Sequence, residues 1–199
     1  MRKYKIIGLI GPTGAGKSEV AQIFKLLDCA VVDADQLSHT TLVKDSVTLR
    51  LLCSIFGNDI VDDDGNPLRR VIAQRAFASQ DNTKLLNSIT HPQIYMSALS
   101  EFKKLVDNGY KYIIFDAPTL IESNGQFLCD TIITVTANIE TRINRIIGRD
   151  NITYDQALAR VNAQQPDDYY ISHSDYVICN DGDISSLIKQ VNEIFMEEQ

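Results

Sequence analysis

The most restrictive feature of the sequence is a glycine-rich loop between a short apolar run and a helical pattern near the amino terminus. The run YKIIGLI has the β-branched and apolar content of a buried strand, and SEVAQIFKLL repeats apolar residues at helical spacing. Between them GPTGAGKS, residues 11–18, fits the pattern GxxxxGK followed by Ser or Thr. This order of elements suits phosphate, because the loop amides and the positive helix end face the same anion. We therefore expect the chain to bind a nucleoside triphosphate such as ATP.

The side chains of this loop have distinct expected roles. Lys17 reaches the β and γ phosphates, and Ser18 can ligate the magnesium ion that accompanies them. An ordinary glycine turn before a helix is the alternative, and the flanking strand and helix argue against it. The residues expected to contact the nucleotide are Gly11, Pro12, Thr13, Gly14, Ala15, Gly16, Lys17, Ser18 and Glu19.

The rest of the chain alternates apolar runs with helical patterns, which is typical of a doubly wound parallel sheet of the α/β class. Four further strands are expected at residues 30–35, 111–118, 131–137 and 175–180. Later helices are expected at residues 138–150, 153–165 and 183–195, and Thr153 and Gln156 have the spacing of a capping box.

Residues 36–109 carry a mostly helical pattern and are expected to form a helical insertion over the sheet. Turns are expected within it at DDDGNP, residues 62–67, and at THP, residues 90–92. The insertion divides one domain of 199 residues without a linker. The expected parts are a core of residues 1–35, 110–137 and 174–199, the insertion of residues 36–109, and a helical lid of residues 138–173.

Composition limits the partners and the cellular compartment. The formal net charge is −7, which argues against nucleic acid because phosphate-binding surfaces are usually basic. No apolar run approaches the length of a membrane span. The cysteines lie far apart without a CxxC pair, so buried thiols in a reducing cytoplasm are expected rather than zinc ligands or disulfides. The oligomeric state is left open.

A second acidic group is expected beside the phosphate loop. Asp116 ends the apolar run KYIIFD, and carboxylates at this position of phosphate-loop folds hold magnesium directly or through water. We therefore expect Ser18 and Asp116 to be the protein ligands of Mg²⁺. A turn-forming aspartate before Pro118 is the alternative interpretation.

Three arginines of the predicted lid are three and four residues apart, which places them along one helix face. The mutual repulsion of Arg142, Arg145 and Arg149 is relieved if they share an anion, such as a transferring phosphate. The alternative is a solvated basic face that is paired with Glu140 and Asp150.

Motifs elsewhere in the chain indicate which class of phosphate-loop protein this is. A GTPase would show the guanine-reading pattern NKxD, and this chain has none. A small chain with a helical insertion and late arginines suits a kinase of small molecules, because phosphoryl transfer needs alignment and charge more than covalent chemistry.

The order and spacing of these motifs resemble the dephospho-coenzyme A kinase family, and the resemblance runs nearly end to end. It covers GPTGAGKS, DAD at residues 33–35 with His39, DGNPLRR at 64–70, His91 with Pro92, DAPTLIES at 116–123, ETRINRIIGRD at 140–150, ALARVNAQ at 157–164 and SDYVICNDG at 174–182.

The resemblance implies a fold and an activity. The fold is that of the phosphate-loop kinases, with a nucleotide core, a helical acceptor-binding insertion and a lid. The activity is ATP-dependent phosphorylation of the ribose 3′-hydroxyl of dephospho-coenzyme A, with Mg²⁺. Asp35 would be the base with Asp33 beside it, Lys17 and Arg145 would complete the catalytic set, and Asn180 would lie near the adenine.

Spacing alone does not choose between Asp33 and Asp35, because both sit at the expected carboxyl edge of the sheet. A pair of helix-capping aspartates is the alternative for DAD. The chain also departs from the family pattern, which commonly has threonine in place of Ile10 and glutamine in place of Arg142.

Three other functions remain compatible with parts of the sequence. A nucleoside or nucleoside-monophosphate kinase would keep the loop and the arginines. A tRNA prenyl transferase also opens with GPTxxGK, but its tRNA-binding face would be basic. A non-catalytic nucleotide switch would leave the paired aspartates and the arginine helix unexplained.

Overall fold

The computed structural model describes residues 3–199, so Met1 and Arg2 of the expected core lie outside the described residues. The chain divides into two compact units. The first contains residues up to Val32 together with Lys104–Gln199, and the second is Asp33–Lys103. The expected insertion of residues 36–109 overlaps most of the second unit. The two units are described separately below.

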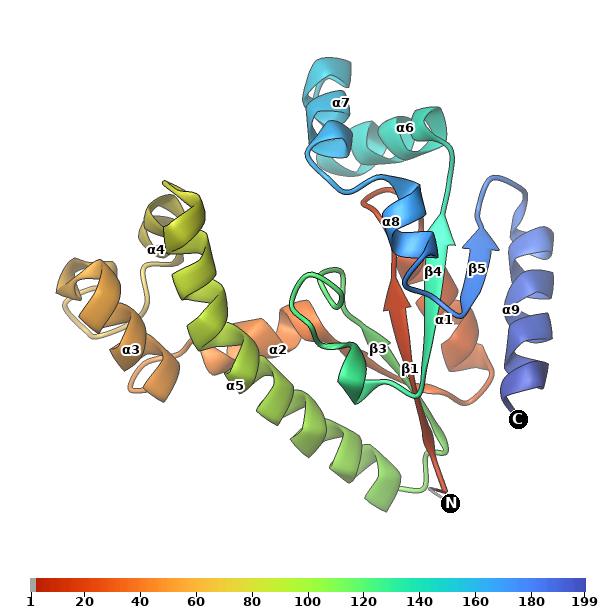
Figure 1. Cartoon of the computed structure of the whole chain (residues 1–199), viewed down its shortest axis with the longest axis horizontal. Helices are drawn as coiled ribbons and strands as arrows, with labels where there is room; N and C mark the ends of the chain where they lie inside the picture. The colour runs from red at the N-terminus through yellow and green to blue at the C-terminus, as the bar shows by residue number, and fades with distance from the viewer. Residues whose placement is uncertain (1–2) are drawn as a thin grey trace. The chain divides into compact units, whose positions relative to one another are not determined.

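Five strands form one sheet in the order β2-β3-β1-β4-β5 (Figure 1). The pairs β1 with β3, β1 with β4, and β4 with β5 are parallel. The expected α/β fold with a doubly wound parallel sheet is therefore confirmed. The strands are β1 (Lys5–Ile10), β2 (Ala30–Asp33), β3 (Tyr112–Asp116), β4 (Thr131–Thr136) and β5 (Tyr176–Cys179).

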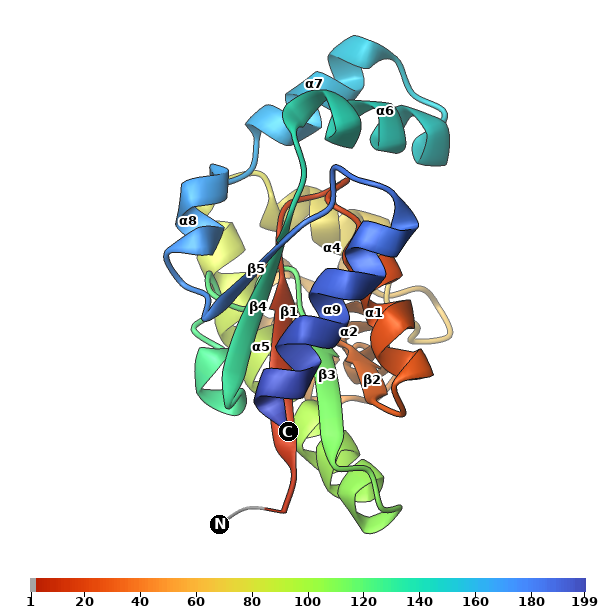
Figure 2. The same ribbon diagram turned by 90° about the vertical axis from the view of Figure 1, so that its right-hand side faces the viewer.

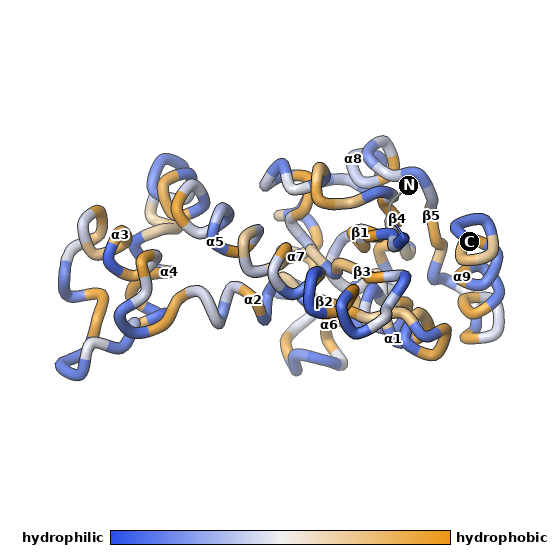
Figure 3. The backbone as a smooth tube through the Cα atoms, turned by 90° about the horizontal axis from the view of Figure 1, so that it is seen from below, coloured by the Kyte–Doolittle hydropathy of each residue, from blue (hydrophilic) through white to orange (hydrophobic). Residues whose placement is uncertain are grey.

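Helices α1 (Lys17–Leu26) and α9 (Ile184–Glu198) lie side by side against one face of the sheet (Figure 2). Their apolar faces meet the strands in one buried cluster, in which the rings of Phe24 and Phe195 pack edge to face at 6.2 Å between centroids. Apolar residues also run along β1, β4 and α1 in Figure 3. Near-continuous apolar strands of this kind are buried on both faces.

The lid segment consists of α6 (Ile139–Asp150), α7 (Tyr154–Asn162) and the short α8 (Asp167–Ile171). Helices α6 and α7 pack on each other beyond the carboxyl end of β4, and α8 contacts β4 (Figure 1). The predicted capping box of α7 is confirmed, since Thr153 and Gln156 bond each other's backbone amides. A 3₁₀ turn, η2 (Gln126–Leu128), precedes β4.

The second unit is helical, as the sequence predicts. Six buried apolar side chains of α3, α4 and η1 form its cluster, and the guanidinium of Arg75 ties two of these elements together by contacting the Asp59 carboxylate and the Phe56 carbonyl. Its elements are α2 (Ala34–Thr41), α3 (Val47–Phe56), η1 (Asn58–Ile60), α4 (Arg69–Ala76) and most of α5 (Gln80–Asp107).

Two details of the predicted secondary structure are wrong. The strand expected at residues 30–35 ends at Asp33, because the Asp33 carboxylate accepts the amide hydrogens of Asp35 and Gln36 and so begins helix α2. The turn expected at residues 90–92 is helical, with Pro92 inside α5. Leu86 and Ile89 of α5 pack against the cluster of the second unit, and such tertiary packing favours a continuous helix despite a proline penalty of about 3 kcal/mol.

The expectation of buried thiols is only partly correct. All four cysteines are free; Cys29 is buried, Cys53 and Cys129 are half-buried, and Cys179 is exposed. Burial raises the pKa of the Cys29 thiol to about 12, which keeps this thiol protonated and unreactive at neutral pH. Among the described helices, none is both long enough and apolar enough to span a bilayer.

The buried cluster of the first unit yields a stability prediction. Phe24 is 0 % exposed and Phe127 is 70 % exposed, so they offer a matched pair of truncations. Phe24→Ala is expected to lower the free energy of unfolding by about 3–5 kcal/mol, because the cavity is lined by packed side chains. Phe127→Ala is expected to change it by no more than about 0.5 kcal/mol. Urea unfolding followed by circular dichroism measures both, and equal shifts would contradict this assignment of the core.

Candidate active site

The glycine loop leaves the sheet where the strand order changes direction. Strand β1 ends at Ile10 between β3 and β4, and helix α1 begins at Lys17. In open α/β sheets ligands bind outside the carboxyl ends of the strands at such a point. The loop and the start of α1 therefore lie where an anionic ligand is expected.

Two glycines of the loop adopt backbone conformations that no other residue fits. Gly11 has φ +137° and Gly16 has φ +97°. A Cβ on Gly11 would lie 2.2 Å from the Val135 carbonyl oxygen, and one on Gly16 would lie 2.1 Å from the Asn180 amide nitrogen. The tight curve of the loop thus requires both positions to lack a side chain.

A hollow of about 310 Å³ opens over the loop. Lys17 is one of its lining residues, and the Lys17 ammonium donates to the Gly11 carbonyl at 3.2 Å. Lid arginines contribute to the wall, so the hollow is bounded by cationic groups from two elements. Its lining residues are Pro12, Thr13, Gly14, Gly16, Lys17, Ser18, Glu19, Arg145, Ile146 and Arg149.

Arg145 and Asn180 are brought together behind the loop. The Arg145 guanidinium donates to the carbonyls of Gly14 and Ala15 at 3.3 and 3.2 Å and to the Asn180 carbonyl at 3.1 Å. The Asn180 side chain, 3 % exposed, donates to the Ala15 carbonyl at 2.9 Å and to the Glu19 carboxylate at 3.0 Å. Its amide hydrogens thus support the phosphate loop, a role that the sequence did not suggest.

The donor set expected for magnesium is chemically suitable. Ser18 lies in the first turn of α1, and Asp116 is the half-buried last residue of β3, in register with Leu9 of the neighbouring β1. Mg²⁺ prefers oxygen ligands and is usually bound by one or two protein groups, several waters and the substrate phosphates. A hydroxyl in the first turn of α1 and a carboxylate at the end of β3 supply oxygen ligands of the kind that this requirement names.

The three lid arginines do not share one acceptor among the described residues. Arg142 is 3 % exposed, which contradicts the alternative of a solvated basic face at this position. Arg149 lines the hollow and pairs with Asp150, which also meets Arg160. These hydrogen bonds, that from Arg149 first, lower the pKa of the Asp150 carboxyl to about 2, so the pair remains ionised at neutral pH.

The two candidate bases adjoin each other in the second unit but differ in their surroundings. The Asp33 carboxylate caps α2 by accepting from the amides of Asp35 and Gln36 at 2.8 and 3.2 Å. Asp35 is exposed in the first turn of α2. The alternative of helix-capping aspartates is therefore confirmed for Asp33, whose carboxylate caps α2.

Two residues that bond to the phosphate loop or to Arg142 beside it have no role predicted from the sequence. Gln164 accepts the Thr13 amide hydrogen at 2.8 Å, and Asp167 pairs with Arg142 at 3.0 Å. Gln164 belongs to a motif of the family resemblance, which could have drawn attention to it. Asp167 stands in a polar stretch without a distinguishing pattern, so its partner could only be seen in three dimensions.

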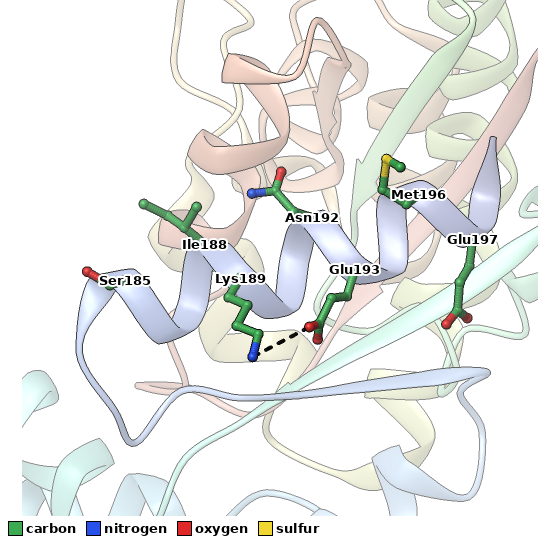
Figure 4. A pocket seen from close by; sticks show the side chains of 7 residues that line it. All are labelled: Ser185, Ile188, Lys189, Asn192, Glu193, Met196 and Glu197. Atoms are coloured by element: carbon green, nitrogen blue, oxygen red, sulfur yellow. Dashed lines mark ion pairs between the residues drawn. The ribbon is translucent and has the colours of Figure 1, made fainter.

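A second hollow lies on the outer face of α9 and shares no residue with the loop (Figure 4). It is lined only by residues of that helix, and Lys189 and Glu193 form an ion pair across it at 3.8 Å. The sequence predicts no functional residue there.

Comparisons with known proteins point to one family. A family model described as dephospho-CoA kinase matches residues 5–186. A dephospho-CoA kinase from Corynebacterium glutamicum is 33 % identical over 191 residues, which cover 96 % of either chain.

Solved structures share the fold. The crystal structure of TT1252 from Thermus thermophilus superposes with a TM-score of 0.84 at 23 % identity, covering 99 % of this chain and 98 % of that one. A dephospho-CoA kinase from Campylobacter jejuni superposes with a TM-score of 0.71 at 19 % identity, covering 100 % of this chain and 98 % of the other.

The crowding at Gly16 yields a prediction for nucleotide binding. Gly16→Ala is expected to weaken ATP binding by about tenfold or more, because the new methyl group would displace Asn180 and strain the loop. Gly148→Ala is the control, since a Cβ there meets nothing within 4 Å and alanine suits the interior of α6. Isothermal titration with ATP compares them, and equal affinities would contradict the proposed crowding.

Proposed function

The chain belongs to the dephospho-CoA kinase family, and we propose that it transfers the γ-phosphoryl group of ATP to the ribose 3′-hydroxyl of dephospho-coenzyme A. Coenzyme A and ADP are the products. The observation that carries the proposal is the glycine loop with Lys17 and Arg145 beside it, in a chain that matches the family over nearly its whole length. The net charge of −7 disfavours a nucleic acid partner, and a cytoplasmic location suits these small-molecule substrates.

The mechanism rests on positioning and charge. The acceptor oxygen bonds to the γ-phosphorus while the bond between that phosphorus and the β,γ-bridging oxygen breaks, and the electron pair leaves on ADP. Lys17 and Arg145 both line the hollow over the loop, and their proposed role is to stabilise the negative charge spread over the transferring group.

Magnesium is proposed as the metal cofactor, held by the Ser18 hydroxyl and the Asp116 carboxylate. When bound, it neutralises charge on the β and γ phosphates. The protein contributes oxygen ligands at the ends of two neighbouring elements, β3 and α1, both of which adjoin β1.

Asp35 is proposed as the group that accepts the proton of the acceptor hydroxyl. The exposed position of its carboxylate leaves it accessible to a substrate, whereas the Asp33 carboxylate accepts two backbone amides of α2. An alcohol in a loose transition state needs orientation more than full deprotonation, so a carboxylate is adequate as the base.

The acceptor is tested by ADP release from ATP and magnesium, with dephospho-coenzyme A compared against nucleosides and nucleoside monophosphates. Turnover confined to dephospho-coenzyme A is expected. Turnover with a nucleotide acceptor would replace the proposed substrate, and ATP binding without any turnover would indicate a switch instead of a kinase.

Removal of the loop lysine tests the phosphate site. Lys17→Ala is expected to abolish measurable turnover, because the transferring phosphate loses its nearest positive charge. Lys189→Ala is the matched control; this lysine is 77 % exposed on α9 and paired with Glu193 (Figure 4). Normal turnover of the Lys17 variant in the ADP-release assay would rule out the loop as the catalytic site.

The two aspartates are distinguished by a parallel pair of substitutions. Asp35→Asn is expected to lower kcat at least about a hundredfold while ATP affinity is kept, the scale of a lost general base. Asp33→Asn is expected to lower kcat much less, because asparagine caps helices about as well as aspartate. Steady-state kinetics of both variants decide the matter, and a larger loss at Asp33 would make Asp33 the base.

A further inference from the structure

A buried cluster centred on Arg142 joins the lid segment to the phosphate loop. All three nitrogens of the guanidinium donate to different parts of the first unit. Nε donates to the Thr13 carbonyl at 3.1 Å, and Nη2 donates to the Gln164 side-chain carbonyl at 3.3 Å. Nη1 donates to the Asp167 carboxylate at 3.0 Å. The cluster therefore connects α6, the loop after α7, the start of α8 and the phosphate loop.

Both polar groups of the Thr13 backbone are held by this cluster. Its carbonyl accepts from Arg142, and its amide donates to Gln164 at 2.8 Å. The backbone of α6 also lies close to Gly14, the residue after Thr13, since a Cβ on Gly14 would lie 2.7 Å from the Arg142 carbonyl oxygen. The orientation of the Thr13 peptides is thus set by the lid segment.

Arg142 and Asp167 form the ion pair of this cluster, and each charge depends on the other for compensation. The Arg142 side chain is 4 % exposed and that of Asp167 is 36 % exposed. Burial lowers the pKa of Arg142, and the nearby Asp167 opposes this shift. An arginine stays protonated at neutral pH, so removing Asp167 would leave a buried cation without its counter-ion.

Thr13 lines the hollow over the phosphate loop, while Arg142, Gln164 and Asp167 do not. Arg142 stands one helical turn before Arg145, which lines the hollow and bonds the loop carbonyls. Anchoring Arg142 therefore also sets the rotation of α6 that presents Arg145 to the loop.

We propose that Arg142 and Asp167 are positioning residues for ATP, which hold the lid segment against Thr13 and preset the phosphate loop for binding. The proposal rests on the proposed function only in taking ATP as the ligand of the loop. Nucleotide affinity thereby depends on an ion pair that lines no part of the hollow.

The experiment measures ATP affinity by isothermal titration without an acceptor, together with kcat and the KM for ATP in the ADP-release assay. Arg142→Met keeps much of the side-chain length but has no donor, so it is expected to raise both Kd and KM for ATP about tenfold or more, the scale of a lost charged hydrogen bond. Its kcat at saturating ATP is expected to change less than about threefold, because the lost interaction supports ATP equally in the ground state and in the transition state.

Two further variants separate positioning from general destabilisation. Arg142→Lys keeps the charge toward Asp167 but cannot form the three-way fork, so it is expected to bind ATP with intermediate affinity. Asp167→Asn, which is nearly isosteric, is expected to weaken ATP binding by at least about threefold. Asp168→Asn removes the same charge from the next, exposed residue and is expected to leave the affinity unchanged.

Each outcome bears on the proposal once circular dichroism shows that the variants are folded at the assay temperature. Unchanged ATP affinity in Arg142→Met and Asp167→Asn would overturn it, as would an equal loss in Asp168→Asn or a loss confined to kcat. If the unmodified chain binds ATP but does not phosphorylate dephospho-coenzyme A, the proposed function fails while the affinity comparison still decides the positioning role.

Discussion

The site depends on a backbone loop whose carbonyl groups are held by donors from the protein. A carbonyl oxygen that faced the phosphate oxygens would repel them, so a loop that binds phosphate must direct its carbonyls elsewhere. Donors from α1, α6 and the end of β5 meet this need. The carbonyls of Gly11, Thr13, Gly14 and Ala15 accept hydrogen bonds from Lys17, Arg142, Arg145 and Asn180.

This arrangement explains how an acidic chain can bind a polyphosphate. The net charge of −7 describes the whole molecule, whereas the hollow over the loop is bounded by Lys17, Arg145 and Arg149. Local potential follows the charges that line a site, and a site with low-dielectric walls concentrates their field. The carboxylates that balance the lid arginines, Asp150 and Asp167, pair with Arg149 and Arg142 beside the loop.

The parts of the fold that were predictable from the sequence are those governed by local patterns. The strand before Gly11 and the capping box at Thr153 follow from apolar content and from spacing over a few residues. The helix through Pro92 and the partnership of Arg142 with Asp167 depend on packing and on residues 25 positions apart, which no local pattern encodes. The hydrogen bonds from Asn180 to Ala15 and Glu19 also join residues far apart in the sequence, so no local pattern could predict them.

In the DAD segment, residues 33–35, the position at which strand β2 ends determines how the two aspartates differ. Had β2 continued through residue 35, the side chains of Asp33 and Asp35 would have shared one face at the sheet edge. Instead Asp33 ends the strand and caps α2, which engages its carboxylate and places Asp35 in the exposed first turn. A capping hydrogen bond therefore distinguishes the two aspartates, because it engages the carboxylate of Asp33 and leaves Asp35 exposed to solvent.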